Sequence, residues 1–295
     1  MNSKQMNRNN KAELIKRIKE LLRIKDEDIV TFKLHHEGYA ADSYTLTTKN
    51  KKYFIKKFIV KKNMNYQWKF TAKSRFIEET KTIDLLNKIR SKEITTPNVI
   101  AKDLKEKILI QKYVEGTSFC KHLVENCNKF YFNKSLKRTF FELGEFLAAF
   151  HTKYRHKTVK EETITQLFGD LCGHNMMFVE KDKMFLFDPA FQKGSIYFDL
   201  AVFARNFYPY NFILRIILSK KGLKALETSF FKGYVANSKF PVSKARMKNK
   251  LIEILKKERT YKTRKLIYVL KKFPVNIYLT ILIKRIKSEK IKVYE

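Results

Sequence analysis

Gly169-Asp170-Leu171-Cys172-Gly173-His174-Asn175 is the segment from which the architecture of this chain is most readily inferred, together with the Phe187-Asp188-Pro189 segment beyond a short apolar stretch. An Asp is followed by an Asn five residues later and by a second Asp at position 188. Phosphoryl transfer needs such a set, because one carboxylate holds the acceptor hydroxyl while an amide oxygen and the other carboxylate hold Mg²⁺ on the nucleotide phosphates.

The residues between Asn175 and Asp188 predict a β-hairpin. Met176–Val179 and Lys183–Phe187 are short and apolar, as strands are, and Glu180–Asp182 is the turn between them. The order is therefore loop, hairpin, loop. Both candidate metal ligands lie at strand ends, and we expect them to face one cleft.

Single residues of this region have simpler interpretations when each is taken alone. Asp170 alone is typical of a turn or a cap, and only its combination with Asn175 and Asp188 favours a phosphoryl-transfer site. His174 has no His or Cys partner at ligand spacing, so a structural hydrogen bond is preferred to metal binding. Asp199 leads an apolar helix as either an N-cap or a buried acid that braces the catalytic loop, and both interpretations stay open.

A lysine in the first half of the chain is the candidate partner of the phosphates. Tyr53–Lys56 is an apolar run that ends in a cation, and a strand lysine facing a cleft neutralises phosphate oxygens when an acid holds it in place. The next helix offers Glu78 and Glu79. Glu79 is preferred because Ile83 and Leu86 place it beside the packed face. An ordinary solvated lysine is the alternative, since the neighbourhood is rich in lysine.

The segment from Gly38 to Ser43 lies between two predicted strands that precede Lys56. It carries a single glycine, so a glycine-rich phosphate loop is not indicated and a turn is the default interpretation. Because of its position, its backbone amides could still cover phosphates.

Changes in hydrophobic periodicity divide the chain into two parts. Helices are predicted at 11–24 and 71–89, and strands at 29–34, 43–48, 52–60, after Pro97 and at 107–114. After Gly116 the chain is mostly helical, with several helices filling 200–288. The pattern predicts an α+β fold of two lobes with a cleft between them. The expected parts are a basic amphipathic helix at 1–26, a nucleotide-binding lobe at 27–115 and a helical lobe at 116–295.

Composition indicates a globular chain with a large excess of positive charge. Of 295 residues, 44% are hydrophobic, and 63 Lys and Arg against 29 Asp and Glu give a net charge of +34. Residues 244–295 alone hold 17 basic and 4 acidic residues. The codon bias of an AT-rich genome explains the high lysine count better than it explains the excess of basic over acidic residues. The alternative is an anionic partner such as lipid headgroups, a phosphorylated glycan or nucleic acid.

The sequence favours a cytoplasmic protein. The opening residues are polar and predict no secretory signal, and the apolar stretches at 207–218 and 275–283 are too short for a membrane span. Three cysteines without metal-ligand spacing indicate reduced thiols. Residues 265–287 alternate apolar patches with basic pairs, so they form either a membrane-surface segment or simply the last helices of the helical lobe.

Taken together, these residues resemble the aminoglycoside phosphotransferase and choline kinase family, relatives of the protein kinases. The family pattern is a His-Gly-Asp loop with an Asn five residues on, an Ile-Asp-Trp-like metal motif and then Asp-Leu-Ala. Gly169-Asp170, Asn175, Phe187-Asp188 and Asp199-Leu200-Ala201 match this pattern, and the likeness runs from Val30 to Arg205. The resemblance implies a two-lobed, protein-kinase-like fold and a kinase that uses ATP and Mg²⁺.

The resemblance also implies roles in the second half of the chain. Asp170 would be the catalytic base, Asn175 and Asp188 would bind Mg²⁺, and Asp199 would be structural. Phe168 is a departure, because the family usually has His there. That His mainly braces the loop, so its absence weakens the match without removing the chemistry.

In the first half of the chain, the resemblance implies that Lys56 holds the α- and β-phosphates and pairs with Glu79. The hinge-like segment 109–116 would bind adenine through the backbone from Lys112 to Val114. A nucleotide loop with few glycines, such as the one here, is common in the family.

The sequence defines the phosphate acceptor less well than it defines the phosphoryl-transfer reaction. Family members that act on cationic drugs or choline surround the acceptor with acids, whereas residues 200–295 of this chain are basic and aromatic. We therefore expect an anionic small-molecule or glycan acceptor, such as a phosphorylated sugar or a surface-glycan precursor. Kinases of lipopolysaccharide core sugars, which are basic and have a related fold, are the favoured comparison. Peripheral contact with an anionic membrane is a further expectation.

Two alternatives stay open. One is an aminoglycoside- or choline-type small-molecule kinase. The other is a pseudokinase that acts as a basic nucleic-acid- or membrane-binding protein. Nucleic acid is the less favoured partner, since the polar groups needed for catalysis are all present: Lys56, Glu79, Asp170, Asn175 and Asp188.

Overall fold

The structure is a computed structural model of the 295-residue chain and describes residues 3–38, 40–59, 71–125, 134–159, 162–180, 182–190, 192–207 and 220–263. It divides into two compact units, of which unit 1 comprises residues 1–81 and 97–115 and unit 2 comprises 82–96 and 116–295. Residues 82–96 group with unit 2, although they lie between the two segments of unit 1 in the sequence. The helices expected beyond residue 263, including the basic stretch 265–287, lie outside the described residues.

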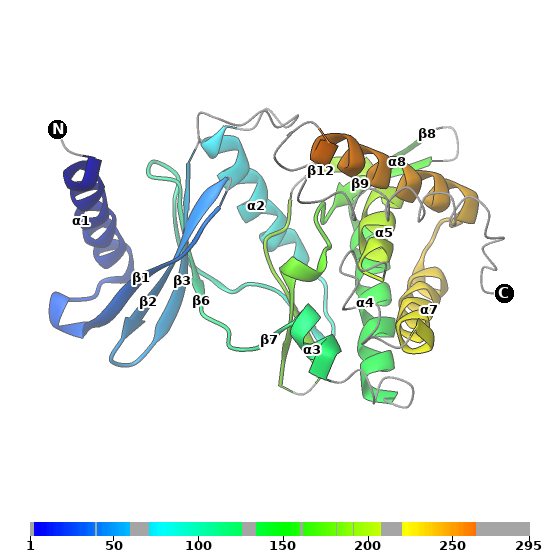
Figure 1. The fold of residues 1–295 in the computed structure, drawn as a ribbon, viewed down its shortest axis with the longest axis horizontal. Coiled ribbons are helices and arrows are strands. Elements are labelled where there is room, and N and C mark those ends of the chain that lie inside the picture. Colours follow the sequence, from blue (N-terminus) through cyan, green and yellow to red (C-terminus); the bar gives the residue numbers. More distant parts are fainter. Residues whose placement is uncertain are drawn as a thin grey trace. The chain divides into compact units, whose positions relative to one another are not determined.

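Unit 1 is built on a five-stranded antiparallel sheet with the strand order β1-β2-β3-β6-β5 (Figure 1). The strands are β1 (Ile29–Glu37), β2 (Ala41–Thr48), β3 (Lys52–Phe58), β5 (Val99–Asp103) and β6 (Ile108–Lys112). All five were expected from the alternating pattern of the sequence, with bounds that differ by a few residues. The central position of β3 places its apolar residues in the core of this unit.

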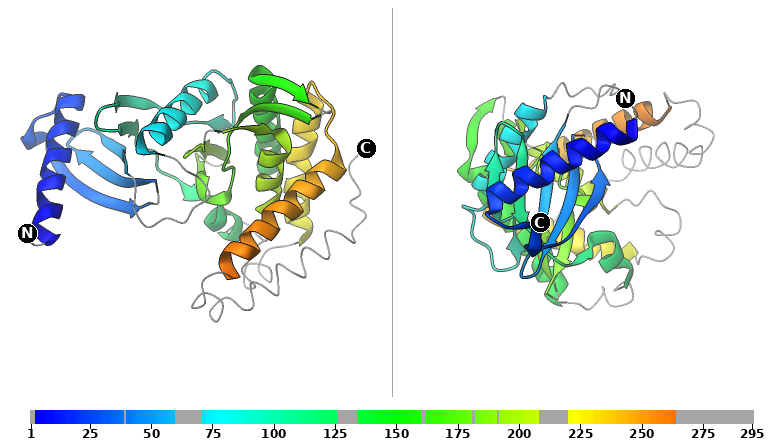
Figure 2. Two further views of the ribbon diagram at one scale, coloured as in Figure 1. Left: turned by 90° about the horizontal axis from the view of Figure 1, so that it is seen from above. Right: turned by 90° about the vertical axis from the view of Figure 1, so that its left-hand side faces the viewer.

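A helix, α1 (Ser3–Leu22), packs against this sheet and crosses its strands in the right-hand view of Figure 2. Leu14 and Ile18 are buried in the apolar core of unit 1. The Arg17 guanidinium donates a hydrogen bond to the Asp103 carboxylate on β5. The helix begins earlier in the chain than predicted and is an integral part of unit 1, because its apolar stripe is buried there.

The second helix, α2 (Ala72–Leu86), is divided between the two units, since the first segment of unit 1 ends at Lys81. Phe76, Ile83 and Leu86 are buried along one stripe, as the helical spacing predicted. Glu79 lies on the same stripe and is also buried. The helix therefore carries an acid on its packed face.

In unit 2 the helices α4 (Lys134–Lys153) and α7 (Lys220–Asn237) pack side by side (Figure 1). Their backbones touch at two glycines. A Cβ atom at Gly144 would lie 2.1 Å from the carbonyl oxygen of Phe230, and Gly233 is equally close to the backbone of α4. No other residue type fits at this crossing without moving a backbone.

The other described helices of unit 2 are α3 (Phe119–Glu125), α5 (Ile196–Arg205) and α8 (Lys244–Thr263). Eight of the ten residues of α5 are buried, and α5 packs against α8. An apolar α5 was expected after residue 198, and its burial explains why it is apolar on every side. No helix among the described residues is long and apolar enough to cross a membrane.

The hairpin predicted between the two candidate metal ligands is confirmed. Its strands belong to a four-stranded sheet with the order β4-β11-β10-β7. The strands are β4 (Ile94–Thr95), β7 (Thr117–Ser118), β10 (Met176–Val179) and β11 (Lys183–Leu186). Met176 lies opposite Leu186 in the antiparallel pair, so the second strand ends one residue before Phe187.

A three-stranded sheet in unit 2, with the order β12-β9-β8, was not predicted. Its strands are β8 (Arg155–Val159), β9 (Glu162–Leu167) and β12 (Gln192–Ser195). These segments are short and largely polar, so their periodicity is weak. The sheet matters for the site because β9 leads directly into Phe168 and β12 leads directly into α5.

Candidate active site

The loop that follows β9 is held in a conformation that requires glycine. Gly169 has a φ of +87°, which L side chains rarely adopt. A Cβ atom at this position would also lie 1.8 Å from the carbonyl oxygen of Ala190. The close contact fixes the backbone immediately before Asp170, and with it the direction in which that side chain leaves the loop.

Asn175 is hydrogen-bonded to Asp170, the candidate base. Its Nδ2 donates to the Asp170 backbone oxygen at 2.9 Å and to Asp170 Oδ2 at 3.0 Å. The backbone N–H of Cys172 donates to the same Asp170 backbone oxygen at 2.8 Å. Because the Asn175 amide nitrogen is used in this way, its Oδ1 is the atom that remains to act as a ligand.

Asp188, the second candidate ligand, follows β11 and has a φ of +55°. This left-handed conformation is uncommon for a residue other than glycine, and such residues are concentrated at functional sites. The preceding residue, Phe187, donates its backbone N–H to the Asn175 carbonyl oxygen at 3.1 Å. This bond ties together the two chain segments that carry the candidate ligands, as the hairpin predicted.

The electrostatic surroundings of Asp170 combine opposing effects. Burial raises the pKa of the Asp170 carboxyl above its usual value, and the nearby Asp188 charge raises it as well. Hydrogen bonds from Cys172 and Asn175 and the positive charge of Arg205 lower it. Burial also raises the pKa of the Cys172 thiol to about 12, so this side chain stays protonated and is not a nucleophile.

Asp199 braces the loop rather than capping its helix. Its Oδ2 accepts the backbone N–H of Phe168 at 2.7 Å, and its Oδ1 accepts that of Gly169 at 2.8 Å. The N-cap of α5 is Ser195, whose side chain accepts a hydrogen bond from the Tyr197 backbone N–H. Of the two interpretations of Asp199, the N-cap is therefore wrong and the brace is confirmed.

Behind Asp199 lies a buried chain of polar side chains. His151 on α4 contacts Asp199 Oδ2 through Nε2 at 3.1 Å, and its Nδ1 lies 2.8 Å from the hydroxyl of Tyr234 on α7. Burial raises the pKa of Tyr234 well above its usual value, so its hydroxyl keeps its proton and can donate it to Nδ1. Because a carboxylate can only accept hydrogen bonds, the Nε2 atom of His151 is the donor to Asp199.

Two residues at the C-terminal end of α5 were not predicted from the sequence. Asn206, the C-cap residue, accepts the Gly173 N–H through Oδ1 at 2.9 Å and donates through Nδ2 to the Leu171 carbonyl oxygen at 3.1 Å. Arg205 places its positive charge near Asp170. An Asn directly after an apolar helix suggests a cap, but the sequence does not say which loop its side chain holds.

Unit 1 contains the predicted pair of Lys56 and Glu79. The Lys56 ammonium donates to Glu79 Oε1 at 2.6 Å, and the two side chains are only 8% and 1% exposed. Lys56 interrupts the alternation of buried and partly exposed residues along β3, because it is buried directly after Ile55. Ser43, on β2, lies opposite Lys56 in the sheet and is buried too. The sheet and α2 therefore bring together three of the residues proposed to serve the nucleotide.

Several backbone N–H groups of the Gly38 segment and of the 112–114 segment already donate hydrogen bonds within unit 1. The Gly38 N–H donates to the Ala41 carbonyl oxygen at 3.0 Å, which is the turn that the sequence suggested by default. The Lys112 N–H donates to Asn98, and the Tyr113 N–H donates to the Lys52 carbonyl oxygen at 3.1 Å. For the N–H of the next residue, Val114, no hydrogen bond to another described residue is found.

The donor set around Asp170 fits Mg²⁺. An amide oxygen and a carboxylate are hard oxygen ligands, and Mg²⁺ is usually bound by one or two carboxylates together with phosphate and water oxygens. Within the described residues there is no group of three His, Cys, Asp or Glu side chains that could hold a metal without such help. His174 is exposed, and no hydrogen bond joins its side chain to another described residue, so the structural hydrogen bond expected for it is not found.

No family model matches this chain, and no curated protein sequence matches it. Solved structures do. They include a Ralstonia eutropha protein assigned to the aminoglycoside phosphotransferases, with a TM-score of 0.60, 12% identity and coverage of 95% of this chain and 99% of the other. A microcompartment-associated aminopropanol kinase matches with a TM-score of 0.55 and 10% identity over 93% and 98% of the two chains. An amicoumacin kinase in complex with AMP-PNP and Ca²⁺ matches with a TM-score of 0.54 and 12% identity over 100% and 91%.

These likenesses establish the fold. The chain has the α+β fold of the protein-kinase-like small-molecule phosphotransferases, as the sequence resemblance implied. The likeness extends over nearly the whole length of the chains compared, so it includes both units. At this level of identity the roles of individual residues rest on their own geometry.

Proposed function

We propose that this chain is a phosphotransferase that moves the γ-phosphate of ATP to a hydroxyl group of a small molecule or glycoconjugate, with Mg²⁺ as its metal ion. The observation that carries the proposal is the 3.0 Å hydrogen bond from Asn175 Nδ2 to Asp170 Oδ2 on a loop held by Asp199. It joins a candidate base to a candidate metal ligand in a chain with the fold of small-molecule kinases.

Asp170 acts as the base in this proposal. The acceptor hydroxyl gives its proton to the Asp170 carboxylate while its oxygen forms the new bond to the γ-phosphorus. The bond between that phosphorus and the bridging β,γ-oxygen breaks, and its electron pair leaves with ADP. The Asn175 amide holds one carboxylate oxygen of Asp170, which leaves the other for the acceptor.

The remaining residues bind and orient the nucleotide. Bound Mg²⁺, held by Asn175 and Asp188, would neutralise charge on the phosphates. Lys56 would contact the α- and β-phosphates, and Glu79 keeps the ammonium in place by an ion pair from which water is largely excluded. The Val114 N–H is the proposed donor to adenine. AMP-PNP in the amicoumacin kinase supports a nucleotide of this type.

We further propose that the acceptor is anionic. The names of the structural neighbours include an amino alcohol and aminoglycosides, which are cations at neutral pH. Recognition of a cation needs carboxylates, whereas this chain has 63 basic against 29 acidic residues. A phosphorylated sugar or a surface-glycan precursor suits that balance better, because a surface of one sign attracts the opposite one.

A screen with radiolabelled ATP tests the proposal. It compares sugar phosphates, anionic glycans, aminoglycosides and choline-like amines as acceptors. We expect transfer to an anionic acceptor, and the Asp170→Ala variant should lose transfer by a factor of about 10² to 10⁴ while it still binds ATP. The control is Asp26→Asn. Asp26 is an exposed aspartate that is distant from Asp170 in the sequence, so this variant should keep wild-type activity.

The metal ligands have their own test. Asp188→Asn should weaken MgATP binding in calorimetry, while binding of metal-free ATP changes little. Transfer at the wild-type rate by Asp170→Ala, or unchanged MgATP affinity in Asp188→Asn, would contradict the assigned roles. Transfer to amines but not to anionic acceptors would contradict only the acceptor class.

A further inference from the structure

Unit 2 contains a cavity of about 720 Å³ that is lined by none of the candidate catalytic residues. Its wall consists of the turn at residues 90–92, one side of α4, and the end of α7 with Lys239. Small-molecule sites commonly have volumes of about 300 to 1,000 Å³, so this cavity is large enough for a ligand of metabolite size.

The lining of the cavity is strongly basic. Its charged residues are Arg90, Lys92, Arg138, Lys153, Lys239, Glu142 and Glu145. Five basic against two acidic side chains leave a net charge of +3 around one hollow. Charges of one sign that surround a concave surface reinforce one another, and they attract an oppositely charged ligand more strongly than the same charges on a flat surface.

The two acids of the lining are already engaged within the protein. Glu142 accepts from Arg138 Nε at 3.0 Å and from the backbone N–H of Glu93 at 3.2 Å. Glu145 accepts from Asn237 Nδ2 at 2.8 Å. Glu142 therefore offsets Arg138, whereas Glu145 is held by a neutral amide, and neither acid forms an ion pair with the other four cations among the described residues.

Those four cations, Arg90, Lys92, Lys153 and Lys239, form no ion pair with any described residue. Lys153 donates to the Lys88 carbonyl oxygen at 3.2 Å, a neutral acceptor that leaves its charge uncompensated. An arginine fork and several ammonium groups are the usual partners of phosphate groups. Ala149, which is exposed on α4, supplies an apolar part of the same wall, against which a carbon skeleton can pack.

We infer that this cavity binds a small organic polyanion that carries phosphate groups, of the size of a sugar bisphosphate. Arg90, Lys92, Lys153 and Lys239 hold the phosphates, and the skeleton lies over Ala149. The site is separate from the proposed transfer chemistry and needs no turnover. If no polyanion binds in this cavity, the proposed function is unaffected. If the chain transfers no phosphate, the inference about this cavity is unaffected.

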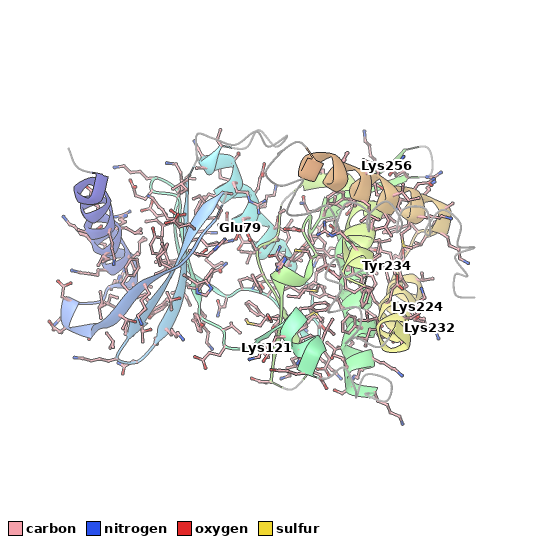
Figure 3. All side chains as sticks on the ribbon, in the orientation of Figure 1. Glu79, Lys121, Lys224, Lys232, Tyr234 and Lys256 are labelled. Atoms are coloured by element: carbon pink, nitrogen blue, oxygen red, sulfur yellow. The ribbon has the colours of Figure 1, made fainter. Side chains whose placement is uncertain are left out.

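Calorimetry on the full chain tests the inference, with fructose 1,6-bisphosphate as the probe and AMP-PNP with Mg²⁺ present in excess. We expect saturable binding of the bisphosphate and none of neutral fructose. The double variant Arg90→Ala/Lys92→Ala should weaken binding at least tenfold. Lys232→Ala/Lys256→Ala removes the same charge from α7 and α8 outside the cavity (Figure 3), and it should weaken binding less than twofold.

A second pair of substitutions, Lys153→Gln/Lys239→Gln, repeats the test with the other two cations of the lining in case the first pair does not fold. Thermal unfolding of each variant shows whether the fold is kept. Two results would overturn the inference. One is the absence of saturable bisphosphate binding to the wild type. The other is equal weakening by the cavity and control pairs, which would mean that the bisphosphate responds only to overall charge.

Discussion

The Asp199 carboxylate accepts a hydrogen bond from the backbone N–H of Phe168 at 2.7 Å. Phe168 occupies the position at which the family resemblance leads one to expect His, and its side chain is fully buried in the apolar core of unit 2. Since the brace uses a backbone N–H, any residue except proline can supply it. The substitution of His by Phe therefore leaves the connection between α5 and the loop intact.

The brace should be needed for catalysis. Asp199→Asn replaces an acceptor oxygen by a donor, so at least one of the N–H groups of Phe168 and Gly169 loses its partner in the core. A buried group without a partner costs about 1 to 3 kcal/mol. We expect a lower melting temperature and a reduced kcat, measured by calorimetry and by a transfer assay. Tyr234→Phe removes only the contact to His151 and should have the smaller effect. Wild-type stability and kcat in Asp199→Asn would contradict the brace.

Asn206 should act as a second positioning residue of the loop. Asn206→Ala removes its hydrogen bonds to Gly173 and Leu171, and we expect a lower kcat with little change in KM for ATP. Asn206→Asp keeps the acceptor for Gly173 but loses the donor to Leu171, so its kcat should lie between those of Ala and wild type. If both variants change KM and leave kcat unaltered, Asn206 does not position the catalytic loop.

The Lys56–Glu79 pair should be coupled in stability as well as in nucleotide binding. Removal of one partner leaves the other charge buried, which typically destabilises a protein by about 3 to 5 kcal/mol. We expect Lys56→Met and Glu79→Gln each to be clearly destabilising and to raise KM for ATP. The double variant should be less destabilised than the sum of the two. Denaturant unfolding of all four proteins measures the coupling, and additive effects would contradict it.

The attachment of α1 should weaken in acid. Burial disfavours the Asp103 carboxylate, but the Glu106 amide and the Arg17 guanidinium outweigh burial and hold the pKa of Asp103 below its usual range. A pKa lowered by folding contributes stability above the unfolded value, and this stability is lost as the pH falls through the folded value. The wild type should therefore lose stability below about pH 4, in the range where Asp titrates.

Arg17→Ala should reduce that acid dependence, because it removes one of the groups that lower the pKa. Melting temperatures between neutral pH and pH 3 measure the difference. Glu20→Gln is the control, since it removes the exposed partner of Arg17 and leaves Asp103 in place. The same acid dependence in Arg17→Ala and in the wild type would contradict this account.

Local patterns in the sequence were enough to predict much of this fold. The strands of unit 1 and the hairpin between Asn175 and Asp188 follow from residues near one another in the chain, because periodicity reports the environment of each side chain. The Lys56–Glu79 pair followed from a strand and the helix after it. The three-stranded sheet of β8, β9 and β12 did not follow, since its segments are polar and carry little periodicity.

The sequence alone also named Asp170, Asn175 and Asp188 as one set, because a single loop and hairpin carry all three. It left Asp199 with two interpretations and assigned Asn206 no partner. Their hydrogen bonds to the loop span 30 to 35 residues of chain and exist only because α5 is buried against that loop. The same holds for Arg17 and Asp103, which are 86 residues apart. Spacing along the chain carries no information on such contacts, and only packing in three dimensions decides them.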